Sequence, residues 1–339
     1  MTFTVTISSS GHQFEAEDNE TILDAALRQN ISLPYGCRNG RCGSCAADLV
    51  SGEVSYYATP PALEEAGEGK CLPCQGFAAG DLEIEVREAD STADIEVRLL
   101  PCRVHAVDHL AHDVVRLLLK LPDGQRLQFL AGQYLDFLLA DGRRRAFSIA
   151  NAPHDDEFIE LHIRHVDGGE FTDWVFSKMK EKTILRVQAP LGTFTLEEES
   201  PRPMIFMGGG TGFAPLKGQI EHAFRVGITR PMVLYWGVRS ARDLYMEELP
   251  LKWAAEHGNF RFVPVLSEPG DDWQGRTGWV HEAVLADIPD PSGHDLYMAG
   301  PPVMINAARE AFRASGMPDA QMHYDSFDYA EDSQAKTAD

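Results

Sequence analysis

Cysteine spacing gives the strongest chemical signal in the chain. Cys37, Cys42 and Cys45 follow the pattern C-x4-C-x2-C, and 28 residues separate Cys45 from Cys74. This spacing is typical of a [2Fe–2S] site of the plant type, in which four thiolates surround two irons. The glycines at 36, 40 and 43 allow the loop to wrap closely around such a group. The spacing therefore predicts an iron–sulfur cluster.

A structural zinc site is the competing interpretation of the same region. Zinc could be held by two C-x2-C pairs, formed by Cys42, Cys45, Cys71 and Cys74. That choice leaves Cys37 unused in a glycine-rich loop, so we favour iron and sulfide. Cys71 is then a spare thiol close to the cluster.

Residues 1 to 90 resemble a chloroplast-type ferredoxin domain, including its GxxLxCQ ending, which reads GKCLPCQ here. The resemblance implies a β-grasp fold and names Cys37, Cys42, Cys45 and Cys74 as the cluster ligands. This segment holds 15 Asp and Glu against 5 Lys and Arg. Such an excess of acid could steer a basic face of a partner protein, or it could be no more than a solvated surface.

A second group of residues could bind a flavin. Arg145, Phe147 and Ser148 end a predicted strand that follows a run of three arginines. An arginine can hold a diphosphate, an aromatic ring can lie against an isoalloxazine, and a serine hydroxyl can bond flavin N5. Taken alone, a surface strand with an exposed arginine is the commoner explanation of such a segment.

The segment LHIRHVDGGEFTDWVF continues this pattern with a strand, a Gly-Gly pair and a helix that Thr172 opens. A helix N-terminus suits a diphosphate, because its backbone amides are unpaired. The simpler alternative is a Gly-Gly turn with Thr172 as an ordinary N-cap.

A third group could bind a nicotinamide nucleotide. PMIFMGGGTGFAP reads as a strand, a glycine loop and a helix, which aims backbone amides at a diphosphate. It is not the G-x-G-x-x-G fingerprint, because Phe213 stands where the last glycine would be.

Together, RAFS, GGEFT, PLGTF, GGTGFAP, YWGVRSARDLY and YMAGPPVM resemble the ferredoxin-NADP reductase superfamily, in the class with an N-terminal ferredoxin domain. The resemblance implies that FAD and a nicotinamide nucleotide are bound by Arg145, Phe147, Ser148, Ile163, Arg164, Gly169, Phe171, Thr172, Gly209, Gly210, Thr211, Gly212, Arg239, Gly300, Pro301 and Phe327. It assigns Ser148 and Phe327 to the reacting end of the site, although Phe327 could instead be a core residue.

Two positions depart from the superfamily pattern. Phe147 stands where Tyr is usual, so a hydroxyl contact is missing, and Ala299 stands where many relatives have Cys. The sequence leaves open whether the dinucleotide is NADH or NADPH. Arg239 and Arg242 could hold the 2′-phosphate of NADPH, whereas Asp243 favours NADH, which we prefer.

The elements that must position these residues fall into three segments. Residues 1–90 read as a β-hairpin, a helix, the cysteine loop and further strands, and a polar junction follows at 89–94. Residues 95–198 hold many short strands separated by turns, which predicts an antiparallel β-barrel. Residues 201–329 alternate strands and helices, which predicts a parallel sheet covered by helices. The tail 330–339 is polar and predicted to be disordered. The fold class is thus α+β and α/β.

Composition excludes some functions. The net charge is -22, from 52 acidic and 30 basic residues, which argues against nucleic acid as a partner. No run of eighteen apolar residues occurs, so we expect no membrane span and a soluble, cytoplasmic protein. We expect a monomer.

The resemblance implies an NADH:acceptor oxidoreductase of the ferredoxin-NAD(+) reductase type. Electrons would pass from NADH, with NADPH as the alternative, to FAD, to the [2Fe–2S] cluster and to a partner oxygenase, either an aromatic-ring dioxygenase or a monooxygenase. One alternative is a CDP-6-deoxy-3,4-glucoseen reductase that supplies a deoxysugar dehydratase, toward which the ending YDSFDYA leans. Another is a non-catalytic, redox-sensing iron–sulfur module.

Overall fold

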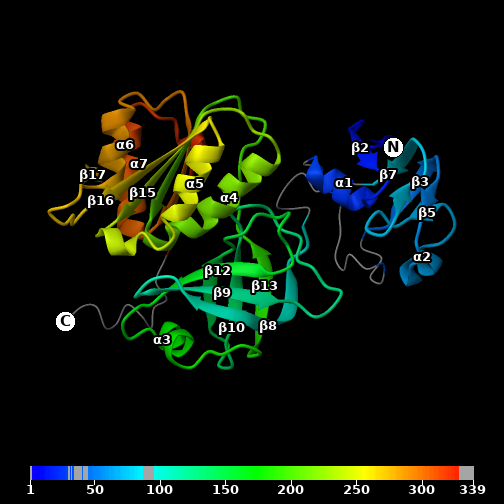
Figure 1. Cartoon of the computed structure of the whole chain (residues 1–339), viewed down its shortest axis with the longest axis horizontal. Helices are drawn as coiled ribbons and strands as arrows, with labels where there is room; N and C mark the ends of the chain where they lie inside the picture. The colour runs from blue at the N-terminus through cyan, green and yellow to red at the C-terminus, as the bar shows by residue number, and fades with distance from the viewer. Residues whose placement is uncertain are drawn as a thin grey trace.

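The computed structural model describes residues 2–29, 31, 33, 40, 45–86 and 95–327. Cys37 and Cys42, the junction 89–94 and the tail 330–339 lie outside these residues. Three larger sheets follow one another along the chain (Figure 1). Each takes its strands from one of the segments 1–90, 95–198 and 201–329, which we keep as the proposed domains.

The first sheet is mixed, with the strand order β2-β1-β7-β3-β5. Strand β1 pairs antiparallel with β2 and parallel with β7, so the hairpin predicted at the N-terminus is present. Helix α1 starts at Thr21, whose hydroxyl accepts from the Asp24 amide at 3.1 Å. The elements are β1 (Thr2–Ile7), β2 (Gln13–Glu17), α1 (Ile22–Arg28), β3 (Ala47–Ser51), β4 (Val54–Ser55), α2 (Pro61–Ala66), β5 (Lys70–Cys71), β6 (Phe77–Ala78) and β7 (Leu82–Glu85).

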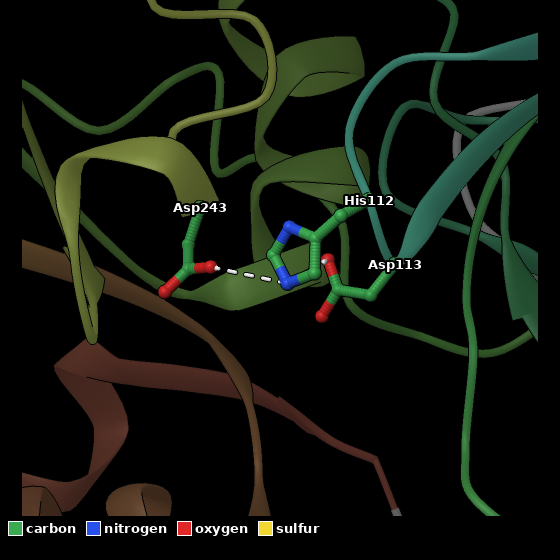
Figure 2. Close-up of side chains that lie close together, drawn as sticks. All are labelled: His112, Asp113 and Asp243. Carbon is green, nitrogen blue, oxygen red and sulfur yellow. Dashed lines mark ion pairs between the residues drawn. The ribbon is translucent and has the colours of Figure 1, made fainter.

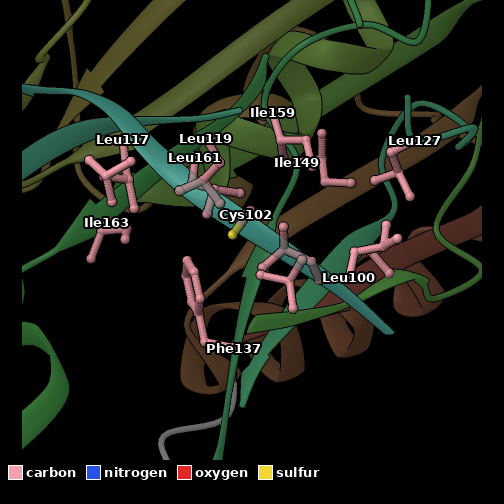
Figure 3. Packing of buried hydrophobic residues seen from close by; sticks show 14 of the residues in the cluster. Leu100, Cys102, Leu117, Leu119, Leu127, Phe137, Ile149, Ile159, Leu161 and Ile163 are labelled. Carbon is pink, nitrogen blue, oxygen red and sulfur yellow. The ribbon is translucent and has the colours of Figure 1, made fainter. Parts of the chain in front are cut away.

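The second sheet is antiparallel throughout, with the order β11-β10-β13-β8-β9-β12. An antiparallel bridge between Ile149 and Leu161 joins its two edge strands, so the sheet closes into the predicted barrel. Figure 3 shows the side chains that fill it, among them Cys102 and Phe137. The elements are β8 (Arg98–His109), β9 (Val114–Lys120), β10 (Tyr134–Leu138), β11 (Arg144–Ser148), β12 (Ile159–Arg164), α3 (Glu170–Ser177) and β13 (Ile184–Leu191).

The third sheet is parallel, with the order β17-β16-β15-β14-β18-β19. Helices α4 and α5 pack on one face and α6 and α7 on the other, which gives two separate hydrophobic cores. The elements are β14 (Met204–Gly209), η2 (Gly210–Gly212), α4 (Phe213–Arg225), β15 (Met232–Val238), η3 (Ala241–Asp243), α5 (Glu248–Glu256), β16 (Phe260–Leu266), β17 (Arg276–Thr277), α6 (Val280–Asp287), β18 (Asp295–Gly300), α7 (Pro302–Ala314), η4 (Asp319–Gln321) and β19 (Met322–Ser326).

Among the described residues, no helix is both long enough and apolar enough to cross a lipid bilayer.

Candidate functional site

Two of the four proposed cluster ligands can be placed in the fold. In the β3–β5 pair, Ala47 lies opposite Cys71, so the antiparallel register carries Cys45 and Cys74 to the same end of the two strands. Both side chains are buried. Their proximity fits a shared metal centre, although the other two proposed ligands lie outside the described residues.

Cys71, which the zinc interpretation requires, is buried in the same hydrophobic core as Cys45 and Cys74. Its side chain is 1% exposed and belongs to the hydrophobic core of the first sheet. Burial, followed by the nearby Asp48 carboxylate, raises the pKa of Cys71 to about 12.

The loop near the cysteines depends on glycine at position 40. Gly40 has φ +73°, and a Cβ there would lie 2.5 Å from Cβ of Pro60. Its carbonyl accepts a hydrogen bond of 3.0 Å from the Ala62 amide in α2. A larger residue at position 40 would clash with Pro60 and disturb the hydrogen bond to Ala62.

The two flavin motifs lie side by side in the barrel domain. Arg143, just before β11, donates to the Glu170 carboxylate at 2.7 Å, and Glu170 is the first residue of α3. The rings of Phe147 and Phe171 are 5.7 Å apart. The start of β11 and the N-terminus of α3 therefore form one surface, as a flavin nucleotide would require.

The structure corrects the interpretation of Thr172 as the residue that opens or caps the helix. Helix α3 starts two residues earlier, and its N-cap is Gly169, which has no side chain to bond the helix amides. The Thr172 hydroxyl instead lies 3.1 Å from the Gly169 carbonyl and 3.2 Å from that of Val166. Without a side-chain cap, the first amides of α3 suit a diphosphate, and Thr172 supports the loop before them.

Ile163 and Arg164 differ in what they can contact. The Ile163 side chain lies in the barrel core, so only its backbone could meet a cofactor (Figure 3). Arg164 points the other way and makes two bonds of 2.8 and 2.7 Å to one oxygen of Asp113. Its guanidinium lies beside Gly210, where a Cβ would be 2.9 Å from Nη1. Arg164 thus connects the barrel to the predicted nicotinamide loop.

In the nicotinamide loop, the backbone that follows β14 packs closely against the backbone that follows β18. A Cβ on Gly212 would lie 1.9 Å from the Ala299 carbonyl oxygen, and one on Gly209 would lie 2.5 Å from Sδ of Met304. Gly300, with φ +145°, closes the other side next to Gly209. These glycines form a cradle at the carboxyl ends of β14 and β18, where parallel sheets bind their ligands. The cradle fits a dinucleotide.

The C-terminal strand connects the two halves of the site. The Phe327 amide donates to the Gly300 carbonyl at 2.9 Å, which holds this residue beside the glycine cradle. Two residues earlier, Asp325 accepts a hydrogen bond of 3.1 Å from the Ser148 hydroxyl. The hydrogen bond between Ser148 and Asp325 therefore links the predicted flavin strand to the segment that ends in Phe327. The Phe327 ring is partly buried against the core of the third domain.

Sequence reasoning missed Asp325, Tyr134 and Asp113. Tyr134 lies opposite Ser148 in the β10–β11 pair, and its pKa is raised by burial and then by Asp136 and Asp325. Asp325 lay inside a motif already singled out, so its position next to the predicted aromatic was a usable signal. Asp113 gave no signal, because only the fold brings it to Arg164.

The segment 239–243, which holds the residues expected to discriminate between NADPH and NADH at the ribose and which we call the ribose-side loop, is built around a buried carboxylate. Asp243 is 6% exposed and accepts from the amide and the hydroxyl of Ser240 at 2.9 and 3.1 Å. Arg239 and Arg242 each approach it at 3.9 Å and remain largely exposed.

Two barrel residues, a histidine and a second carboxylate, lie next to Asp243 (Figure 2). His112 Nε2 lies 3.7 Å from Asp243 and 3.8 Å from Asp113. The three residues could in principle hold a metal. Because arginines already pair with both carboxylates, we interpret the group as an ion-pair cluster between barrel and nucleotide domain.

Comparison with known proteins identifies the family. Residues 5–79 match the family model of the 2Fe-2S iron-sulfur cluster binding domain, 101–196 that of the oxidoreductase FAD-binding domain, and 206–310 that of the oxidoreductase NAD-binding domain. The chain is 39% identical over 328 residues to the CDP-6-deoxy-L-threo-D-glycero-4-hexulose-3-dehydrase reductase of Yersinia pestis, covering 96% of this chain and 99% of that protein. The chain belongs to the N-terminal-ferredoxin class of the ferredoxin-NADP reductase superfamily.

Two further relatives show the range of this class. The reductase subunit of an aromatic O-demethylase from Amycolatopsis is 36% identical over 336 residues, covering 96% of this chain and 99% of that protein. The crystal structure of an Amycolatopsis cytochrome P450 reductase aligns with a TM-score of 0.66 and 36% identity, over 96% of this chain and 98% of that one.

These findings confirm the predicted fold class and cofactors. The reductase is an oxidoreductase with [2Fe–2S], FAD and NAD domains, and it passes electrons to an accepting partner. The match to a 2Fe-2S domain supports iron and sulfide over zinc.

Proposed function

We propose that this reductase takes electrons from NADH and delivers them one at a time to a separate oxygenase. The observation that carries the proposal is the junction at the C-terminal strand. Phe327 is bonded to Gly300 of the nucleotide domain, and its neighbour Asp325 is bonded to Ser148 of the barrel. When bound, the nicotinamide supplies hydride, the flavin converts an electron pair into single electrons, and the cluster carries one electron.

The chain's own residues would hold and orient these groups. Cys37, Cys42, Cys45 and Cys74 would hold the cluster. Arg145, the uncapped first turn of α3 and the ring of Phe147 would hold the flavin. Gly209–Gly212, Arg239, Gly300 and Pro301 would hold the dinucleotide. Phe327 would cover the reacting face until the nicotinamide arrives.

Ser148 is the residue we assign to the reacting end. Ser148→Ala removes a buried hydroxyl bonded to Asp325, so flavin reduction by NADH should slow by about tenfold to a hundredfold, the effect of one lost hydrogen bond. Anaerobic stopped-flow absorbance measures this rate. The matched control is Ser177→Ala, which removes an exposed hydroxyl in the same domain. Equal rates for both variants would exclude a role for Ser148.

NADH is the proposed dinucleotide. Asp243 is a buried carboxylate on the ribose-side loop, and it should repel a 2′-phosphate. Asp243→Asn keeps an oxygen for Ser240 but removes the charge, so kcat/KM for NADPH should rise about tenfold, a gain of about 1.4 kcal/mol. The value of kcat/KM for NADH should change less. Steady-state kinetics with both dinucleotides test this, with the exposed Asp290→Asn as control; an unchanged NADPH value contradicts it.

The relatives support two candidates for the electron-accepting partner. An oxygenase is our first candidate, because reductases of a P450 and of an aromatic O-demethylase align with nearly the whole chain. A hexulose-3-dehydrase is the second candidate, favoured by the 39% identity to its reductase. Single-turnover assays with each purified acceptor, reductase and NADH distinguish the two. If the reductase reduces neither acceptor, both candidates are contradicted. If NADH does not bleach the flavin, the result supports the alternative of a non-catalytic, redox-sensing module.

We further propose that the reductase acts as a monomer in the cytoplasm. The cofactor-binding surfaces described above all come from one chain. Light scattering after size-exclusion chromatography tests the first point, and fractionation of cells tests the second.

A further inference from the structure

Strand β12 carries two different faces. Ile159, Leu161 and Ile163 point into the barrel core, whereas the alternate residues Glu160 and His162 face the nucleotide domain. The His162 side chain is fully buried, and Glu160 is 12% exposed. Buried polar residues of this kind normally need a complete set of hydrogen bonds.

His162 has both of its partners. Its Nε2 lies 2.8 Å from Glu160 Oε1, and its Nδ1 lies 2.9 Å from the hydroxyl of Tyr245. An ionised carboxylate only accepts, so Nε2–H donates to Glu160 and Nδ1 accepts from Tyr245. Burial lowers the pKa of His162, which keeps the ring neutral and preserves this order of donors. Tyr245 comes from the loop that follows the ribose-side residues Arg239 and Asp243.

Helix α4 makes a second connection across the same interface. Lys217 Nζ lies 3.3 Å from the Ala150 carbonyl, 3.4 Å from Glu160 and 3.0 Å from Glu221. Its side chain is 7% exposed. Next to it, a Cβ on Gly218 would lie 2.9 Å from the Asn151 carbonyl, so the helix backbone touches the barrel directly.

Both connections join pieces of the reacting site. Ala150 lies two residues after Ser148, and Lys217 lies on the helix that begins directly after Gly212. We propose that Tyr245, His162, Glu160 and Lys217 are positioning residues that fix the nicotinamide loop against the flavin strand. The proposal rests on the hydride route proposed above. Their hydrogen bonds link the barrel to the nucleotide domain, so they would act by holding the two domains in one arrangement, since small misplacement of reactants slows a reaction strongly.

Tyr245→Phe is the sharpest test, because it removes one hydroxyl and keeps the ring packed edge-on against Phe213 and Trp236. FAD and iron content should stay at the wild-type level, and the Kd for NADH should change less than about twofold, while the limiting rate of flavin reduction falls about tenfold. The control is Tyr235→Phe. It removes a hydroxyl that donates a hydrogen bond of 3.0 Å to Asp287, inside the nucleotide domain.

A double-mutant cycle with His162→Leu separates positioning from general damage. If the Tyr245–His162 bond carries the effect, the double variant should be no slower than the slower single variant. Hydrogen exchange gives a readout without activity. Amides of β12 and α4 should exchange about tenfold faster in Tyr245→Phe than in Tyr235→Phe. If Tyr245→Phe folds poorly, Lys217→Gln provides a second test, because it removes the hydrogen bonds of α4 to the barrel. It should show the same slower flavin reduction and faster amide exchange.

Equal reduction rates and equal exchange in Tyr245→Phe and Tyr235→Phe would overturn the proposal. Failure of the proposed function looks different. In that case NADH would not reduce the flavin of the wild-type protein, while the exchange difference at the interface would still be measured.

Discussion

Cys74→Ser should abolish electron delivery while leaving the flavin reaction intact. Reduction of a one-electron acceptor such as cytochrome c should fall by on the order of a hundredfold, at least the loss expected when a metal site is damaged. Reduction of the flavin by NADH should be unchanged, because Ser148 and the glycine cradle lie in the other two domains. Iron content and acceptor reduction are the two measurements.

Cys71→Ala is the matched control for this variant. Cys71 lies three residues before Cys74 and is equally buried in the same hydrophobic core, but it is not one of the four proposed cluster ligands. We expect full iron content and full acceptor reduction in Cys71→Ala. Loss of metal from both variants, with zinc in the wild-type protein, would instead support the C-x2-C interpretation.

Gly212→Ala should disable the nucleotide site. The new Cβ would lie 1.9 Å from the Ala299 carbonyl oxygen, and backbone atoms on both sides cannot yield as a flexible side chain could. The forced shift should destabilise the domain by about 1–3 kcal/mol. It should also move the loop away from Ser148, so that flavin reduction by NADH slows by about a hundredfold. Thermal unfolding and stopped-flow absorbance measure the two effects.

Gly258→Ala provides the comparison in the same domain. A Cβ there meets no atom within 4 Å, so stability and rate should stay at the wild-type values. Normal rates in Gly212→Ala would show that the cradle tolerates displacement and would remove it from the proposed site. FAD content should be normal in both variants, since the flavin strand lies in the barrel.

Much of the site could be predicted because its signals are local. The cysteine spacing, the Gly-Gly pair and the glycine loops each occupy a few nearby residues. Cluster binding requires the cysteines, and backbone geometry requires the glycines. The order of the motifs then gave the three sheets. Strand and helix periodicity sufficed for the barrel and for the parallel sheet, because each buries a regular pattern of apolar residues.

The contacts that join the domains could not be predicted in this way. Ser148 and Asp325 are 177 positions apart, and His162 and Tyr245 are 83 apart, so no local pattern pairs them. The Thr172 interpretation failed for a related reason. A threonine near a Gly-Gly pair is a common cap, but here Gly169 is the N-cap, α3 starts at Glu170, and the Thr172 hydroxyl bonds back to the loop.

Freeze-quenched electron paramagnetic resonance tests the central claim most directly. The reductase is mixed with NADH without oxygen, and samples are frozen as the flavin absorbance falls. We predict the signal of a reduced [2Fe–2S] cluster after the flavin has bleached, and no such signal in Cys74→Ser. Flavin bleaching with no cluster signal in the wild-type protein would contradict the proposed route from NADH through this chain.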